Sequence, residues 1–198
     1  MVKAIFAAAG GRVTLIAFAL LVASTLTLYF VNPKNEIKKG LGCDYVATDS
    51  TFLYETGAVT KMLGKYQQRP EYYAAHESFI RVYDFVYPPF YAIPCALVLA
   101  YFFPVLFPGR GGWLRWLVLL PLAAMAFDYA ENFTMLSFIR SFRDDPQTPL
   151  TLLEVSRAFT NAKLLLLLAC DLILLVFGAL ALIRLRRTLE SPAARPRG

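Results

Sequence analysis

Residues 152–183 read LLEVSRAFTNAKLLLLLACDLILLVFGALALI, and the second half of this stretch is almost wholly apolar. A helix of about 20 apolar residues crosses the bilayer core, which is about 30 Å thick, so the stretch is long enough to span a membrane. It is followed by a cluster of arginines, namely Arg184, Arg186, Arg187, Arg195 and Arg197. Such a cluster is typical of a membrane helix that ends beside anionic lipid headgroups. The stretch therefore predicts a transmembrane helix in an integral membrane protein.

The whole chain shares this bias toward apolar residues. Of its 198 residues, 58% are hydrophobic, 15% are aromatic and only 17% are charged. Soluble domains have about half apolar and about a quarter charged residues, so the composition argues against an ordinary soluble enzyme and against disorder. The net charge is +6, but its densest part lies next to an apolar run. Nucleic-acid binding needs basic residues clustered with exposed aromatic side chains, so we expect no nucleic-acid partner.

The apolar runs predict an all-α integral membrane protein with a bundle of four transmembrane helices. We place these helices at residues 13–31, 79–107, 113–138 and 152–183. They form a single domain over residues 1–190, and residues 191–198 are expected to be a disordered tail. The second span contains Pro88 and Pro89, which should kink the helix or begin a new one.

A long polar connection, residues 32–78, joins the first two predicted spans. Apolar residues recur within it at helical spacing, namely Phe52, Leu53, Val59, Met62, Leu63 and Tyr66. Gly64 lies near the end of this pattern, and Arg69-Pro70 interrupts it. We expect an extracytoplasmic amphipathic helix that lies on the bilayer or over the helix bundle.

The topology follows from the number of spans and from the basic residues. Four spans place both termini on the same side of the membrane. The opposite loops hold a similar number of basic residues, but the arginine density after residue 183 and the short turn at residues 108–112 favour cytoplasmic termini. We therefore expect a multi-pass protein of the cell inner membrane with both termini in the cytoplasm.

Polar residues inside the predicted spans mark candidate functional positions, because each ionisable residue there costs about 2.5 to 3.5 kcal/mol on insertion. They are Arg81 and Asp84 in the second span, Asp128, Glu131 and Asn132 in the third, and Arg157, Asn161, Lys163 and Asp171 in the last. The i, i+3, i+4 spacing of Asp128, Glu131 and Asn132 places all three on one helix face.

Depth along the helices brings these residues to a common level. At 1.5 Å per residue, Asp128 lies about 20 Å and Lys163 about 30 Å from the inner ends of their helices. Asp84 lies a turn or two from the outer end of its span, so all three fall in the outer third of the bilayer. We predict a polar ligand-binding pocket that opens to the outer face beneath the 32–78 connection. Its predicted residues are Asp84, Asp128, Glu131, Asn132, Arg157, Asn161 and Lys163.

The chemistry of this pocket rests on its carboxylates. Asp128 and Glu131 form a like-charge pair on one helix turn, and such pairs hold a proton or a cation. Paired carboxylates can act as acid and base or hold an ammonium group. We expect the ligand to be a small lipid-like or cationic amphiphile, with membrane lipids as partners, and the sequence leaves open whether the protein is an enzyme. The alternative is an accessory or assembly subunit that joins a membrane protein or a second copy, its polar residues serving as interhelical contacts.

We expect no metal and no cofactor. His76 is the only histidine, and the three cysteines lack CxxC spacing, so a zinc site is disfavoured. Asp128 and Glu131 are the ligand type that magnesium prefers, but no phosphate-binding motif accompanies them. Hydrolase and metalloprotease motifs are also absent from the sequence.

Residues 84–91 read DFVYPPFY, an acid followed by aromatic residues and prolines. With four spans and a long first connection, this segment resembles the sterol isomerase and sigma-2 receptor superfamily. Proteins of that superfamily bind sterols or amphiphilic amines against buried acids, so the resemblance implies such a ligand here. It covers one helix: the first span of this chain has no acid, and the string of Asp128, Glu131 and Asn132 has no counterpart in that superfamily.

Overall fold

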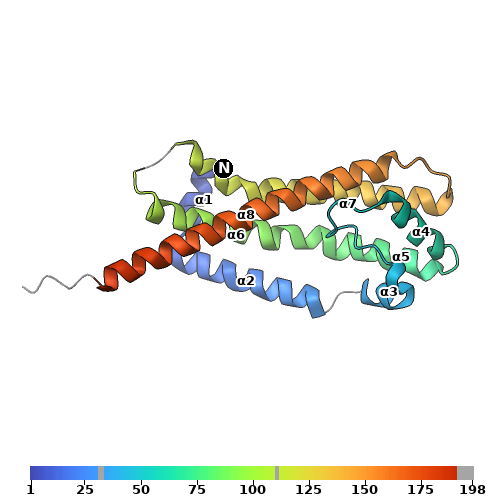
Figure 1. Cartoon of the computed structure of the whole chain (residues 1–198), viewed down its shortest axis with the longest axis horizontal. Coiled ribbons are helices and arrows are strands. Elements are labelled where there is room, and N and C mark those ends of the chain that lie inside the picture. The colour runs from blue at the N-terminus through green and yellow to red at the C-terminus, as the bar shows by residue number, and fades with distance from the viewer. Residues whose placement is uncertain (31–33, 110–111, 191–198) are drawn as a thin grey trace, which may run out of the picture.

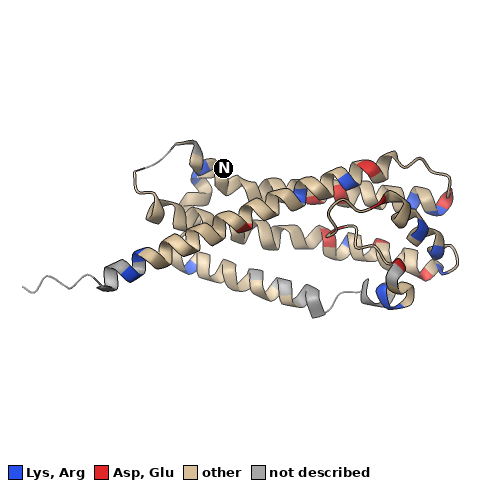
Figure 2. Cartoon of the chain, in the orientation of Figure 1, with Lys and Arg blue, Asp and Glu red and all other residues tan. Residues whose placement is uncertain are grey.

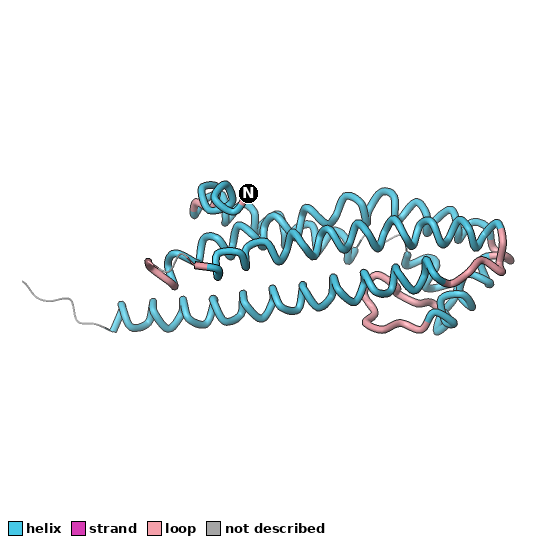
Figure 3. The backbone as a smooth tube through the Cα atoms, turned by 90° about the horizontal axis from the view of Figure 1, so that it is seen from above, coloured by secondary structure: helices cyan, strands magenta, loops and turns pink. Residues whose placement is uncertain are grey.

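The computed structural model describes residues 1–30, 34–109 and 112–190, and all regular structure in these ranges is helical (Figure 3). The α-helices are α1 (Val2–Ala8), α2 (Gly11–Phe30), α3 (Lys34–Leu41), α4 (Thr56–Tyr66), α5 (Pro70–Phe79), α6 (Phe85–Leu106), α7 (Leu120–Asp144) and α8 (Thr151–Glu190). Short 3₁₀ helices cover Gly42–Asp44 and Trp113–Leu119, and a π-helical turn covers Ile80–Asp84. The predicted all-helical fold is confirmed for this part of the chain, while the predicted tail at 191–198 lies outside the described residues.

The four long helices α2, α6, α7 and α8 run along the long axis of the molecule, and α3, α4 and α5 gather at one end (Figure 1). Helix α7 packs against α8 and α6, and α6 packs against α2. The C-terminal turns of α8 project past the neighbouring helices in both views (Figures 1 and 3). The N-terminus and the end of α8 lie at the same end of the bundle, as an even number of long helices requires.

Two helical stretches, Pro70–Leu106 and Thr151–Arg184, are long and apolar enough to cross a membrane. The pair Val2–Ala8 and Gly11–Leu20, bent by 97°, makes a third if it counts as one span. Only 11% of the apolar window in α8 is buried, as expected of a helix whose neighbours are lipids. Figure 2 shows basic residues at the end that holds the N-terminus, charges of both signs at the opposite end, and few charges between. The chain is therefore a multi-pass membrane protein.

The predicted helix bounds were partly wrong. The second long helix begins at Pro70 rather than at residue 79, because a proline fits the first turn of a helix, where its missing N–H is not needed. The third predicted span is divided into the 3₁₀ helix Trp113–Leu119 and α7, and Pro121 at the start of α7 marks the change. Helix α7 also continues to Asp144, beyond the predicted end at 138, and it is not among the helical stretches that are apolar enough to count as candidate spans.

The Pro88–Pro89 pair neither breaks α6 nor ends it. A proline deprives the carbonyl four residues earlier of its helical N–H donor. Helix α7 replaces both donors: Asn132 Nδ2 donates to the Asp84 carbonyl at 2.7 Å, and Tyr129 Oη donates to the Phe85 carbonyl at 3.1 Å. The π-helical turn lies directly before these carbonyls and accommodates the change in helix geometry. The prolines therefore fix α6 to α7 instead of kinking it away.

Helix α4 packs over the bundle and contributes to the largest buried apolar cluster of the described residues. Four of the predicted amphipathic residues lie on its buried face, namely Val59, Met62, Leu63 and Tyr66. The assignment of Phe52 and Leu53 to the same helix was wrong, because both lie in the turn before α4 and are exposed. The connection therefore covers one end of the bundle through α4 and the loop that precedes it.

Candidate functional site

A cavity of about 430 Å³ lies along the boundary between α6 and α8. Its walls come from α6, α7, α8 and the loop before α4, through Asp49, Ser50, Asp84, Tyr87, Tyr91, Cys95, Asp128, Lys163, Leu164, Leu167 and Asp171. Tyr87, Tyr91 and Cys95 recur every four residues, so they share one face of α6. We call this space the α6–α8 cavity.

Lys163 meets two carboxylates of α7 beside this cavity. Its Nζ lies 3.1 Å from Asp128 Oδ1 and 2.5 Å from Glu131 Oε2. The contact with Glu131 is a close ion pair whose geometry is not that of a hydrogen bond. All three residues are buried, with exposed fractions of 4% for Lys163, 8% for Asp128 and 2% for Glu131. Two carboxyl groups therefore share one ammonium group in this buried cluster.

The position of Lys163 follows from the pattern of α8. Its buried residues recur at intervals of three, four or seven positions, namely Leu153, Ser156, Thr160, Lys163, Cys170 and Phe177. The small hydroxyl side chains of Ser156 and Thr160 allow close packing of α8 on α7. Because Lys163 belongs to this stripe, its side chain points toward α7, where Asp128 and Glu131 lie one turn apart.

Tyr91 completes the surroundings of Asp128. Its Oη donates to Asp128 Oδ2 at 3.0 Å, so each carboxylate oxygen of Asp128 has a partner on a different helix. Asp128 thereby connects α6, α7 and α8. Tyr91 was not among the predicted site residues. Its spacing could have indicated it, because Tyr91 follows Asp84 by seven residues and so returns to the same helix face.

Three predicted site residues do not belong to this cluster. Asn132 caps the Asp84 carbonyl, as described above. Asn161 Oδ1 accepts a hydrogen bond from the Leu53 backbone N–H at 2.9 Å, which ties the loop before α4 to α8. Arg157 is half-buried on α8, and within the described ranges it forms no ion pair with Asp128, Glu131 or any other carboxylate.

The structure thus brings Asp128, Glu131 and Lys163 into direct contact, and Asp84 lines the cavity beside them.

Tyr54, in the loop that covers this end of α8, is buried, and this burial raises the pKa of its phenol to about 12. Its hydroxyl donates to the Leu153 carbonyl at 3.5 Å. The loop is therefore held on α8 by a neutral phenol as well as by Asn161.

Asp171 lies closer to the C-terminus of α8 than Lys163 does, and it also lines the cavity. It follows Lys163 by eight residues, which is about 12 Å along a helix. In the part of the chain that the structure describes, its carboxylate has no hydrogen-bond or ion-pair partner. A carboxylate within an apolar span is costly, so Asp171 is a further candidate for ligand contact.

The lining of the cavity determines what it can hold. Four aspartates and one lysine surround it, together with the apolar surfaces of two tyrosines and two leucines. Among the residues with described positions, no group of three or more His, Cys, Asp or Glu side chains is arranged to hold a metal ion. The geometry favours a ligand that presents positive charge to carboxylates and apolar surface to the walls.

No protein-family model, no curated protein and no solved structure matches the chain. The resemblance of residues 84–91 to the sterol isomerase and sigma-2 receptor superfamily therefore stays a prediction. The function has to follow from the geometry and the charge of the α6–α8 cavity.

Proposed function

We propose that the α6–α8 cavity binds a small amphiphile that carries a positive charge, such as an amine with an apolar body. The observation that carries this proposal is the charge of the lining, where four aspartates stand against Lys163. Lys163 is already shared by Asp128 and Glu131, and among the described residues the carboxylate of Asp171 has no hydrogen-bond or ion-pair partner. A cationic headgroup would pair with Asp171 where the local dielectric is low.

The shape of the cavity supports a small ligand with an apolar part. Its volume of about 430 Å³ falls in the range of roughly 300 to 1,000 Å³ that is typical of ligand pockets. Tyr87 and Tyr91 present aromatic rings, which attract an ammonium group through cation–π interactions. Leu164 and Leu167 offer apolar surface to the body of the ligand. Binding is the activity that this geometry supports, and we assign no catalytic step.

We further propose a single domain with four membrane crossings, made by α2, α6, α8 and the segment from Trp113 into α7. Residues 113–127 rise by about 2.0 Å per residue in the 3₁₀ helix and by 1.5 Å in α7, which totals about 26 Å. Asp128 then lies at the outer boundary of the bilayer core, and the cavity opens there beneath the loop before α4. The arginines after residue 183 favour cytoplasmic termini in the cell inner membrane.

The test uses hexyltrimethylammonium and hexanol as probes for the full chain in lipid nanodiscs. We expect the cation to raise the unfolding temperature and the neutral alcohol of equal chain length to leave it unchanged, because stabilisation by a ligand depends on its affinity. Asp171→Asn should remove most of this rise, while the exposed Asp144→Asn, which lies outside the cavity, should retain it. Equal effects of both probes, or an unchanged response of Asp171→Asn, would contradict the proposal.

One observation favours the alternative of an assembly subunit. Asp171 also borders a groove on the exposed face of α8, lined by Leu174, Leu175, Gly178, Ala179 and Leu182. Small residues allow another membrane helix to approach closely, and a basic residue on that helix would pair with Asp171. Native mass spectrometry of the purified protein separates the two proposals. A membrane-protein partner that is lost in Asp171→Asn supports the subunit, and a bound amine supports the pocket.

A further inference from the structure

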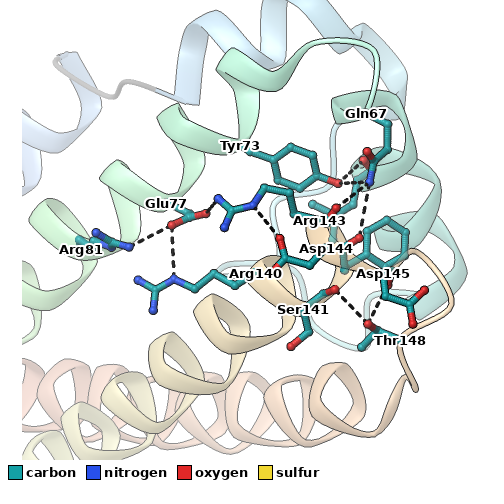
Figure 4. A network of polar contacts seen from close by, with 12 residues as sticks. Gln67, Tyr73, Glu77, Arg81, Arg140, Ser141, Arg143, Asp144, Asp145 and Thr148 are labelled. Carbon is teal, nitrogen blue, oxygen red and sulfur yellow. Dashed lines mark hydrogen bonds and ion pairs between the residues drawn. The ribbon is translucent and has the colours of Figure 1, made fainter.

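A second polar cluster lies at the end of the bundle where α5 and α7 meet (Figure 4). Glu77 of α5 is buried, and its carboxylate contacts three arginines. Arg81 Nη2 and Arg140 Nε donate to Oε2 at 3.0 and 3.3 Å, and Arg143 Nη1 donates to Oε1 at 2.7 Å. Arg81 is one of the polar residues predicted within a span, but the cluster that it forms with Glu77 was not predicted from the sequence.

Positive charge is in excess here, and it lies on the accessible side. The Glu77 side chain is 10% exposed, whereas those of Arg81, Arg140 and Arg143 are 54%, 42% and 45% exposed. Asp144 also pairs with Arg143, at 3.4 Å from its Nε, but it is highly exposed. Among the described residues, each guanidinium group uses only one or two of its N–H donors, so most remain open to a ligand.

A cavity of about 480 Å³ lies beside these guanidinium groups. Arg81, Arg143 and Ser78 line it with hydrogen-bond donors, and Val82 and Tyr73 give it apolar walls. We call this space, together with Arg140, the arginine cleft. The planar fork of an arginine matches the oxygens of a phosphate group, and several arginines around one space favour an anion that can accept many hydrogen bonds.

An apolar track leads from the arginine cleft along the outside of the bundle. Val82 directly follows Arg81, Val86 and Phe90 come four and eight residues after Val82, and all three apolar side chains are exposed. On α7, the exposed ring of Phe133 packs edge-on against Phe85, with ring centroids 4.8 Å apart. A free phosphate ion would have no use for this surface, whereas the acyl chains of a lipid would cover it.

We propose that the arginine cleft binds the phosphate headgroup of an anionic phospholipid, whose acyl chains lie along the track of Val82, Val86 and Phe90. Basic pockets between membrane helices hold anionic lipid headgroups through the same chemistry. Arg81 and Arg143 contact the phosphate oxygens from within the cleft, and Arg140 contributes its outward-facing N–H groups. Glu77 pairs with all three guanidinium groups and so competes with the phosphate for their N–H donors. The site is independent of the α6–α8 cavity.

The test is a titration of the detergent-solubilised full chain, followed by native mass spectrometry, with phosphatidylglycerol, phosphatidylcholine and inorganic phosphate as separate probes. We expect phosphatidylglycerol to bind most tightly. Arg81→Gln should weaken its binding about tenfold, which corresponds to about 1.4 kcal/mol. Arg69→Gln is the matched control, because it removes the same charge at the same end of the molecule and its side chain donates to Tyr72 outside the cleft. Its affinity for phosphatidylglycerol should equal that of the wild type.

Two further variants distinguish recognition from general attraction of charge. Arg140→Lys keeps the charge but loses the planar fork, so binding should weaken several-fold. Glu77→Gln removes the competing carboxylate and should tighten phosphatidylglycerol binding, a gain that a purely structural cluster would not produce. This second arm keeps the test decisive if Arg81→Gln folds poorly. Equal affinities of Arg81→Gln and Arg69→Gln, equal binding of phosphatidylcholine, or inorganic phosphate binding as tightly as the lipid would each overturn the proposal.

Discussion

The α6–α8 cavity and the arginine cleft arrange charge in opposite ways. In the cavity a buried cation, Lys163, is held by two carboxylates, and further aspartates line the accessible space. In the cleft a buried anion, Glu77, is held by three guanidinium groups that are themselves half-exposed. In both proposals the ligand carries the sign of the buried charge, because the groups that surround this charge have the opposite sign. The groups around a buried charge, rather than the buried residue itself, are therefore the basis on which we predict the charge of each ligand.

The strongest way to break this comparison is to remove the buried cation. Lys163→Met leaves Asp128 and Glu131 buried without their shared partner, and loss of one partner of a buried pair costs about 3 to 5 kcal/mol. We expect the free energy of unfolding in detergent, measured with denaturant, to fall by that amount. Lys65→Met is the control: Lys65 pairs with Asp44 at the surface, so it should cost less than about 1 kcal/mol.

A second substitution tests whether the loss comes from stranded charge. Asp128→Asn in the Lys163→Met background should recover part of the lost stability, because an amide removes one buried charge and keeps the shape of the side chain. Equal losses in Lys163→Met and Lys65→Met would show that the buried ion pairs do not hold α7 to α8.

The counterpart in the arginine cleft should cost less. Glu77→Gln leaves three guanidinium groups without their anion, but these groups are half-exposed and water can solvate them. Hydrogen bonds to charged groups contribute about 1.5 to 3 kcal/mol, which sets the expected loss. High salt should reduce this loss by screening the exposed charges, while the loss in Lys163→Met should hardly change. If the loss in free energy of unfolding depends on salt equally in Lys163→Met and Glu77→Gln, the contrast between the buried lysine and the exposed arginines is wrong.

Asp171→Asn tests the exposed carboxylate of the α6–α8 cavity, as opposed to the buried ion pairs beside it. Because Asp171 has no partner among the described residues, the free energy of unfolding of the Asp171→Asn variant should differ from that of the wild type by less than about 0.5 kcal/mol, as at ordinary exposed positions. The same variant should lose the response to hexyltrimethylammonium. A large destabilisation would mean that Asp171 contributes to folding and not to binding of the cationic ligand.

The smallest effect belongs to a surface cluster that serves as a baseline. Asp44 pairs with Lys61 at 2.8 Å and with Lys65, and hydrogen bonds from these lysines lower its pKa from 3.8 to about 2. A lowered pKa contributes stability above the unfolded value, and that stability is lost as the pH falls from about 4 toward 2. Thermal unfolding over this pH range should therefore show a small decline that Asp44→Asn lacks. An identical decline in both proteins would assign it to other carboxyl groups.

Periodicity and depth along the chain were sufficient to predict that Asp128, Glu131 and Lys163 lie close together. The spacing of Asp128 and Glu131 placed both on one face of α7, and counting residues from the helix ends brought Lys163 to their level. These are properties of single helices, which the sequence encodes locally. The all-helical, multi-pass character follows from apolar runs for the same reason.

Contacts between distant segments could not be predicted in this way. Arg140 and Arg143 reach Glu77 across more than 60 residues of sequence, and no local pattern links them. Asn132 was assigned to the ligand site for its polarity, but its contact is with a backbone carbonyl that a proline had left without a donor. Phe52 and Leu53 fitted a helical spacing, yet the helix begins after them. In each case the answer depends on how helices pack, which spacing within one helix does not contain.

The hydrogen bonds from α7 to the Asp84 and Phe85 carbonyls bear on the rate and the free energy expected for ligand binding. The carbonyls of Asp84 and Phe85 depend on donors from α7, so a slide of α6 along α7 by one residue would lose both hydrogen bonds together. That wall of the cavity is therefore preorganised, and a ligand loses little free energy in ordering it. For the proposed amphiphile we therefore expect association to be limited by passage past the loop before α4, which hydrogen bonds from Leu53 and Tyr54 hold on α8, and not by rearrangement of the helices.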